Sequence, residues 1–122
     1  MLETEGIKPQ PRQISQSDTE HFDRDGFSGD VYVKPEDGLE FSALMVDVHG
    51  KHPLKRMINA TRSYLVIKGN GSFTLNGKET EVKEGDLFVV PDGGEYRYQG
   101  TMKLFEFNVP GTTSNNSLTL EQ

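Results

Sequence analysis

Apolar residues alternate along short runs of this chain, and no segment repeats them at the three- and four-residue spacing of an amphipathic helix. The clearest local signal is Asn76-Gly77, which separates two strand-like runs, 72–75 and 78–82. Asn and Gly both tolerate the positive φ that the tight turn of a β-hairpin requires. The sequence therefore predicts antiparallel strands joined by short turns.

Further strand-like runs fill the middle of the chain. We expect about nine strands. Eight runs can be placed along the chain, at 30–33, 39–49, 62–68, 72–75, 78–82, 87–90, 96–98 and 104–109. The run 39–49 is apolar at both parities, which is typical of a strand in the wall of a barrel or sandwich. Closing the sheet on itself removes unpaired strand edges. The expected fold class is therefore all-β, a single small β-barrel or jelly roll.

The two ends of the chain differ from its middle. The first twenty residues are rich in Gln, Ser and Pro, and the last dozen are rich in Thr, Ser and Asn. We expect a polar N-terminal arm over 1–29, a barrel over 30–110 and a C-terminal tail over 111–122. The arm is either loose or ordered only against a partner chain.

Composition excludes several classes of protein. The 122 residues include no cysteine, which removes disulfide frameworks, thiolate metal sites and cysteine nucleophiles. A net charge of -6 argues against nucleic-acid binding, because that needs an excess of Lys and Arg on the surface. No apolar run approaches the roughly 18 residues of a membrane span, and the polar N-terminus lacks the apolar stretch of a secretory signal. The sequence predicts a cytoplasmic protein without membrane or nucleic-acid partners.

Glycine and proline recur at fixed spacing in two frames. The first frame begins at Gly50 and ends at Gly69, and its three inner positions are Arg56, Ile58 and Arg62. The second frame follows after the hairpin and reads Gly85, Pro91, Gly93, Tyr96, Gly100. Both frames, in this order, resemble the two motifs of the cupin superfamily of small β-barrels. The resemblance covers roughly residues 39–110 and implies a cupin-type barrel.

Cupins usually hold a metal ion with three histidines and a glutamate at these positions, but here Arg56, Ile58, Arg62 and Tyr96 stand there. A guanidinium stays protonated and would repel a divalent ion. The resemblance therefore implies a cupin without the usual metal, and we expect no cofactor.

The same frames indicate a binding site. The period of two places Arg56 on the same strand face as Ile58, and Arg62 on the same face as Tyr64. In cupins this face points into the barrel. A third strand contributes two more tyrosines to the same interior. The expected ligand-binding residues are Arg56, Arg62, Tyr64, Tyr96 and Tyr98. A buried guanidinium needs an anionic partner, so the pocket suits a small anionic or carbohydrate-like ligand.

Other interpretations of these residues stay open. The arginines could pair with internal carboxylates such as Glu95, Glu106 or Asp47, or a register shift of one residue could turn them to solvent. The tyrosines could be packing residues only. A shifted metal site could use His49 and His52, which otherwise are surface residues at a strand end.

Three functions fit the sequence, and whether the protein is an enzyme stays open. The first is a metal-independent cupin that binds a small molecule. The second is a sugar or nucleotide-sugar isomerase or epimerase, with Tyr96 as acid and Glu95 or Glu106 as base. The third is a non-enzymatic interaction module. Because cupins commonly pair, a homodimer is expected.

Overall fold

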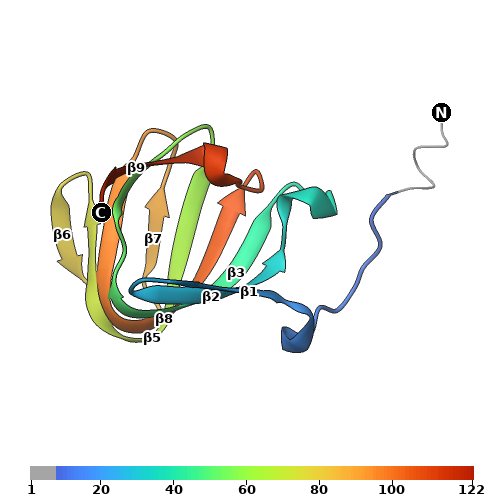
Figure 1. The fold of residues 1–122 in the computed structure, drawn as a ribbon, viewed down its shortest axis with the longest axis horizontal. Coiled ribbons are helices and arrows are strands. Elements are labelled where there is room, and N and C mark those ends of the chain that lie inside the picture. Colours follow the sequence, from blue (N-terminus) through green and yellow to red (C-terminus); the bar gives the residue numbers. More distant parts are fainter. Residues whose placement is uncertain (1–7) are drawn as a thin grey trace.

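The computed structural model describes residues 8–122, which form one strongly curled antiparallel sheet (Figure 1). The strands are β1 (Glu20–Arg24), β2 (Phe27–Val33), β3 (Ser42–Lys51), β4 (Leu54–Met57), β5 (Thr61–Leu75), β6 (Lys78–Glu81), β7 (Leu87–Val90), β8 (Glu95–Val109) and β9 (Ser117–Glu121). Short 3-10 turns lie at η2 (Gln16–Asp18), η3 (Pro35–Asp37) and η4 (Ser114–Asn116). Within this part of the chain, no helical segment is long and apolar enough to cross a membrane. The expected all-β barrel is confirmed.

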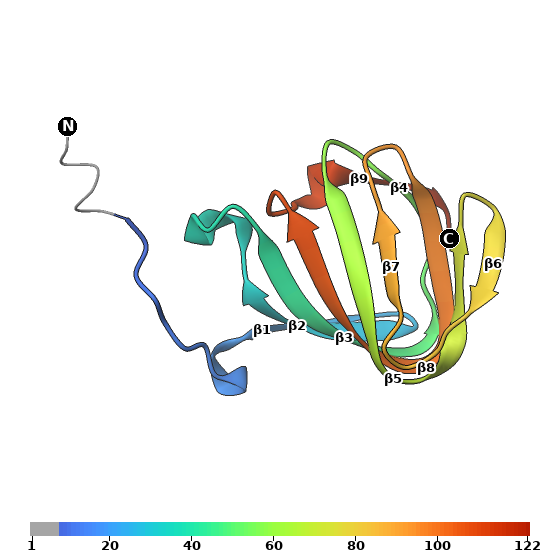
Figure 2. The same cartoon turned by 180° about the vertical axis from the view of Figure 1, so that it is seen from behind.

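Two long strands connect the two walls of the barrel. β5 and β8 have 15 residues each and pair with one another along nearly their whole length. One wall follows the order β1-β2-β3-β8-β5-β7, and the other follows β6-β5-β8-β4-β9 (Figure 2). The runs 62–68 and 72–75, expected as separate strands, are therefore halves of one bent strand, as are 96–98 and 104–109.

The bend depends on two motif glycines. Gly69 and Gly100 have φ of +106° and +138°, a region that L side chains rarely adopt. A Cβ on Gly69 would lie 2.3 Å from the carbonyl oxygen of Thr101, and one on Gly100 would lie 2.4 Å from that of Asn70. The spacing of the frames thus reflects where the paired strands β5 and β8 approach one another most closely, at the corner of the barrel.

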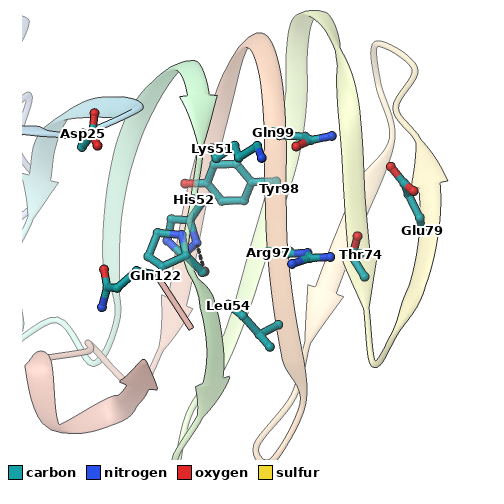
Figure 3. Close-up of a pocket in the computed structure, with 11 residues that line it drawn as sticks. Asp25, Lys51, His52, Leu54, Thr74, Glu79, Arg97, Tyr98, Gln99 and Gln122 are labelled. Atoms are coloured by element: carbon teal, nitrogen blue, oxygen red, sulfur yellow. Dashed lines mark hydrogen bonds between the residues drawn. The ribbon is translucent and has the colours of Figure 1, made fainter. Parts of the chain in front are cut away.

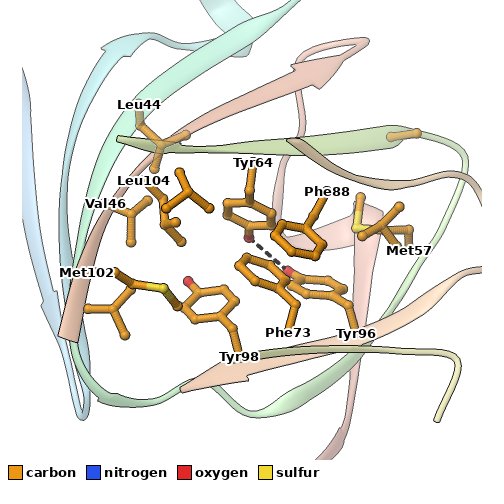
Figure 4. Close-up of a cluster of buried hydrophobic side chains, with 14 residues drawn as sticks. Leu44, Val46, Met57, Tyr64, Phe73, Phe88, Tyr96, Tyr98, Met102 and Leu104 are labelled. Carbon is orange, nitrogen blue, oxygen red and sulfur yellow. Dashed lines mark hydrogen bonds between the residues drawn. The ribbon is translucent and has the colours of Figure 1, made fainter. Parts of the chain in front are cut away.

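Alternation along the strands fills the space between the walls. The even-numbered side chains of β8 point inward, and β5 changes parity at a bulge between Val66 and Lys68. Aromatic side chains dominate this core, with Phe73 stacked on Phe88 at 4.3 Å between ring centroids (Figure 4). The Asn76-Gly77 turn joins β5 to β6 as predicted, with φ of 47° and 85°.

The sheet extends beyond the expected barrel at both ends. β1 and the start of β2 lie within the segment expected to be an arm, and β9 lies within the expected tail. β1 and β9 lie at the sheet edges and are mostly exposed. Backbone hydrogen bonds hold them in place, without the apolar alternation that predicts a strand from the sequence. Residues 8–15 extend away from the barrel (Figure 1), and residues 1–7 of the expected arm lie outside the described part.

Candidate functional site

A cleft of about 520 Å³ opens between the walls, at the end of the barrel where β3 and β5 begin and β8 ends. Its apolar side is formed by Phe22, Val31, Val33 and Leu44. Its polar lining includes Lys55 from β4, Arg62 from β5 and Glu106 from β8. The sequence segments that meet here are far apart in the chain, and the curl of the sheet brings them together.

Arg62 lies at the floor of the cleft and is held on every side. Its Nε lies 3.2 Å from Glu106 Oε2 and donates to Asn108 Oδ1 at 2.7 Å. One terminal nitrogen donates to the hydroxyl of Tyr96 at 2.8 Å, and the other donates to Thr112 Oγ1 at 3.0 Å. Burial, the largest single effect, lowers the pKa of Arg62, but Glu106 together with Tyr64 and Tyr96 outweighs it, and the pKa lies well above its ordinary value. The guanidinium charge is therefore balanced inside the protein.

Asn108 extends this network to the opposite strand. Its amide nitrogen donates to Glu106 Oε2 at 2.9 Å and to Ser42 Oγ at 3.0 Å. Within residues 8–122, no fully buried side-chain nitrogen or oxygen lacks a hydrogen-bond partner. A satisfied buried network is rigid, so the floor of the cleft is preorganised.

The three inward tyrosines lie beneath this floor. Tyr64, Tyr96 and Tyr98 are at most 2% exposed, and the Tyr64 hydroxyl donates to that of Tyr96 at 3.3 Å (Figure 4). Burial raises the pKa of each phenol above its ordinary value, so all three stay neutral. They face the interior as expected, but only Tyr96 reaches the polar floor, through Arg62.

Arg56 lies on the outer face of the barrel, so the expectation of an inward Arg56 is wrong. Its guanidinium pairs with Glu95 at 2.7 Å, and the two side chains are 44% and 34% exposed. The cause is an irregularity between Leu54 and Lys55, which changes the parity between His52 and Met57. A shift of one residue reverses the face of every following side chain.

The same shift turns Lys55 inward, a residue that the frames did not single out. It lies opposite Tyr96 in the β4–β8 pairing and is half-buried in the cleft wall. Burial lowers the pKa of Lys55, and the charge of Arg62 lowers it further. The sequence analysis missed Lys55 because the frame assigns Arg56 to the inward face, and alternation then assigns Lys55 to the outward one.

The two histidines lie on opposite faces. His49 is exposed, whereas His52 is buried in the core and stacks on Tyr98 at 4.4 Å between ring centroids. Its Nδ1 lies 2.7 Å from the carbonyl oxygen of Pro53 and must donate the proton. Burial, then the charge of Lys55, lowers the pKa of His52 to about 3. His52 is therefore a neutral core residue and not a surface residue.

A second pocket, of about 430 Å³, lies against the outer side of β8. Figure 3 shows Arg97 and Gln99 beside it, pointing away from the core that Tyr98 enters. Its lining is mostly polar and exposed, and Arg97 has a long ion pair there with Glu121 at 3.9 Å. It lacks the rigid buried network of the cleft.

The structure resembles several solved proteins along most of its length. Streptomyces Pac13, a nucleoside dehydratase solved with uridine, aligns at a TM-score of 0.82 and 21% identity over 93% of each chain. KdgF from Halomonas aligns at a TM-score of 0.73 and 13% identity, over 87% of this chain and 98% of that one. The Cnp3 cupin domain of Schizosaccharomyces pombe aligns at a TM-score of 0.65 and 20% identity, over 83% of this chain and 75% of that one.

The chain has the cupin fold. In addition, residues 64–101 match the AraC-like ligand binding domain family. No curated protein sequence matches the chain.

The residues of this cupin-fold chain do not fit the metal ion that the fold commonly holds. Of the four usual ligand positions, Arg56 faces outward, Arg62 is a buried cation and Tyr96 stays protonated. Within residues 8–122, no three His, Cys, Asp or Glu side chains are grouped closely enough to hold a metal ion. The alternative site on His49 and His52 is not supported either, because the two side chains point to opposite faces.

Proposed function

We propose that this cupin binds a small anionic or carbohydrate-like molecule in the cleft at the open end of its barrel, without a metal ion. The observation that carries the proposal is the floor of the cleft, where Arg62, Glu106 and Asn108 form a fixed set of donors and acceptors. Small-molecule sites typically combine an apolar wall with a few such polar groups. The apolar wall around Phe22 supplies the other half of this arrangement.

The comparisons support a polar, carbohydrate-like ligand. A solved relative in fold carries uridine, which presents both a flat ring and a sugar with hydroxyls. In this chain the ring of Phe22 could cover a flat or sugar face, while the carboxylate of Glu106 accepts hydrogen bonds from hydroxyls. Arg62 and the tyrosines below it would act mainly by holding Glu106 in place.

A second candidate is an enzyme that acts on such a carbohydrate. Glu106 and the Tyr96 hydroxyl both contact Arg62, so a carboxylate and a phenol lie close together at the cleft floor. Glu95 is not a base for Tyr96, because it lies on the outer face with Arg56. Pac13 is named a dehydratase, and its solved variants include Tyr-to-Phe and His-to-Gln substitutions with uridine. We therefore keep a lyase or isomerase reaction with Glu106 as base as the alternative.

Ligand binding is tested on protein treated with a metal chelator. Calorimetric titration with uridine and simple sugars, before and after chelation, should give the same affinity in both states. Glu106→Ala should weaken binding at least tenfold if the carboxylate holds a hydroxyl group, whereas Glu95→Ala, on the outer face, should not. Loss of binding on chelation, restored by a divalent ion, would refute metal independence.

We also propose a homodimer, formed by the outer face of β5, β7 and the end of β8. Six large apolar side chains on this face are 36–59% exposed: Leu65, Ile67, Leu87, Val89, Phe107 and Val109. Strand pairing places Leu65 opposite Leu87, so the side chains form a continuous patch. Large exposed apolar patches commonly mark interfaces.

Light scattering should give twice the mass of the chain, and Leu87→Glu should reduce this value to the mass of a single chain. A monomer in the unmodified protein would contradict the dimer. The cytoplasmic location and the absence of nucleic-acid partners remain predictions from the sequence.

A further inference from the structure

Lys55 is a cation in the cleft wall that the surrounding protein does not neutralise. Its side chain shares the inward face of β4 with Met57 and is half-buried. None of the ion pairs formed among residues 8–122 includes Lys55. A partly buried ammonium without a carboxylate beside it is unfavourable, so this position favours an anion from outside the chain.

The charges that face Lys55 strengthen this conclusion. Arg62 from β5 and Arg24 from β1 both lower its pKa, and Glu106 from β8 is the carboxylate that opposes them. Glu106, however, already lies 3.2 Å from Arg62 and accepts from Asn108. The whole cleft lining contains four basic side chains, Arg24, Lys34, Lys55 and Arg62, and three carboxylates, Glu20, Glu36 and Glu106. The positive charge of the cleft therefore exceeds its negative charge by one.

The arginine at the floor is a poorer candidate for this role. All three nitrogens of the Arg62 guanidinium already donate to partners within the chain, and its charge is paired with Glu106. An incoming anion would have to displace one of these buried contacts. Among residues 8–122, Lys55 has no such contact to lose. Its four-carbon stem lets the ammonium move toward the cleft.

We infer that Lys55 binds an anionic group of the ligand, a phosphate or a carboxylate, at the β4 side of the cleft. The inference rests on the proposed function, because it names the ligand class of the same site. The uncharged part of the ligand would then extend toward the apolar wall at Phe22 and Leu44. This assigns the recognition of charge to a residue other than the two arginines at the ligand positions of the frame.

The experiment compares pairs of ligands in which one member carries an anionic group and the other does not. The probes are uridine with uridine 5′-monophosphate for a phosphate, galactose with galacturonate for a carboxylate, and inorganic phosphate as a competitor. Calorimetry measures each affinity for the unmodified protein, for Lys55→Gln, and for Lys78→Gln. Lys78 is exposed on β6, so its replacement removes the same charge far from the cleft. Circular dichroism and the unfolding midpoint verify that each variant is folded.

The unmodified protein should prefer the charged member of at least one pair, and the pair that shows the preference distinguishes phosphate from carboxylate. Lys55→Gln should weaken binding of that charged member roughly 10- to 100-fold, the range of a charge-assisted hydrogen bond. Binding of the neutral member should change less than about twofold, and Lys78→Gln should change neither.

Two results would overturn this inference and leave the proposed function standing. One is an equal loss of affinity for the charged and neutral members in Lys55→Gln, and the other is an equal loss in Lys78→Gln. If none of the probes binds the unmodified protein, the proposed function fails for these ligand classes and the inference fails with it.

Discussion

Replacing Glu106 with Gln removes the charged partner of Arg62 and keeps the size of the side chain. The two side chains are only 11% and 9% exposed, so the guanidinium would stay buried with no carboxylate beside it. Removing one member of a buried ion pair lowers the free energy of unfolding by about 3–5 kcal/mol. Arg62 keeps its hydrogen bonds to Tyr96 and Thr112, so we expect the lower end, about 3 kcal/mol.

The chain contains a matched control for this prediction. Arg56 and Glu95 form a pair of the same chemistry on the outer face, where the side chains are 44% and 34% exposed. Solvent screens exposed pairs, and they contribute about 0–1 kcal/mol. Glu95→Gln should therefore change the free energy of unfolding by less than about 1 kcal/mol, and the difference between the two variants isolates the effect of burial.

Urea unfolding followed by circular dichroism measures both free energies. In calorimetry, a loss of about 3 kcal/mol should lower Tm by roughly 9–15 °C for a domain of this size. The double variant Arg62→Met, Glu106→Leu should recover only part of the loss. An apolar pair leaves no buried charge, but it also removes the donor to the buried Asn108 Oδ1. Equal losses in Glu106→Gln and Glu95→Gln would refute the view that Arg62 and Glu106 form a buried, mutually dependent pair.

Two further predictions concern the corner and the core. Gly69→Ala should lower the free energy of unfolding by more than about 2 kcal/mol, because its Cβ would meet the backbone of Thr101. Gly85→Ala, at a φ of +91° but with open space around it, should lower the free energy of unfolding by only about 1 kcal/mol. Similar urea midpoints for the two variants would contradict the close approach of β5 and β8 at Gly69. Because the pKa of His52 is about 3 when folded and near 6.5 when unfolded, the unfolded chain binds more protons below pH 6.5. The free energy of unfolding should then fall as the pH is lowered from about 6.5 towards 3, and His52→Gln should weaken this dependence. An NMR titration midpoint near 6.5 for His52 would exclude the buried neutral form.

The barrel and much of its interior followed from local patterns in the sequence. The Asn76-Gly77 turn and the corner glycines Gly69 and Gly100 depend on backbone angles that few residue types adopt, so they are visible without a structure. Tyr96 and Tyr98 were expected in the interior from the cupin resemblance and the period of two, and the alternation along β8 confirms that they point inward. These features are local, because each depends on φ and ψ or on neighbours two residues away.

The partners of the charged residues depended on the tertiary structure. The face on which Arg56 and Lys55 lie is decided by an irregularity in β4, where the strand adjusts its pairing with β9. The partners of Arg62 are decided by the register of the β5–β8 pairing, which places Arg62 opposite Asn108 and next to Glu106. Alternation determines that a side chain points inward, but only the closed sheet determines which inward-facing charges meet.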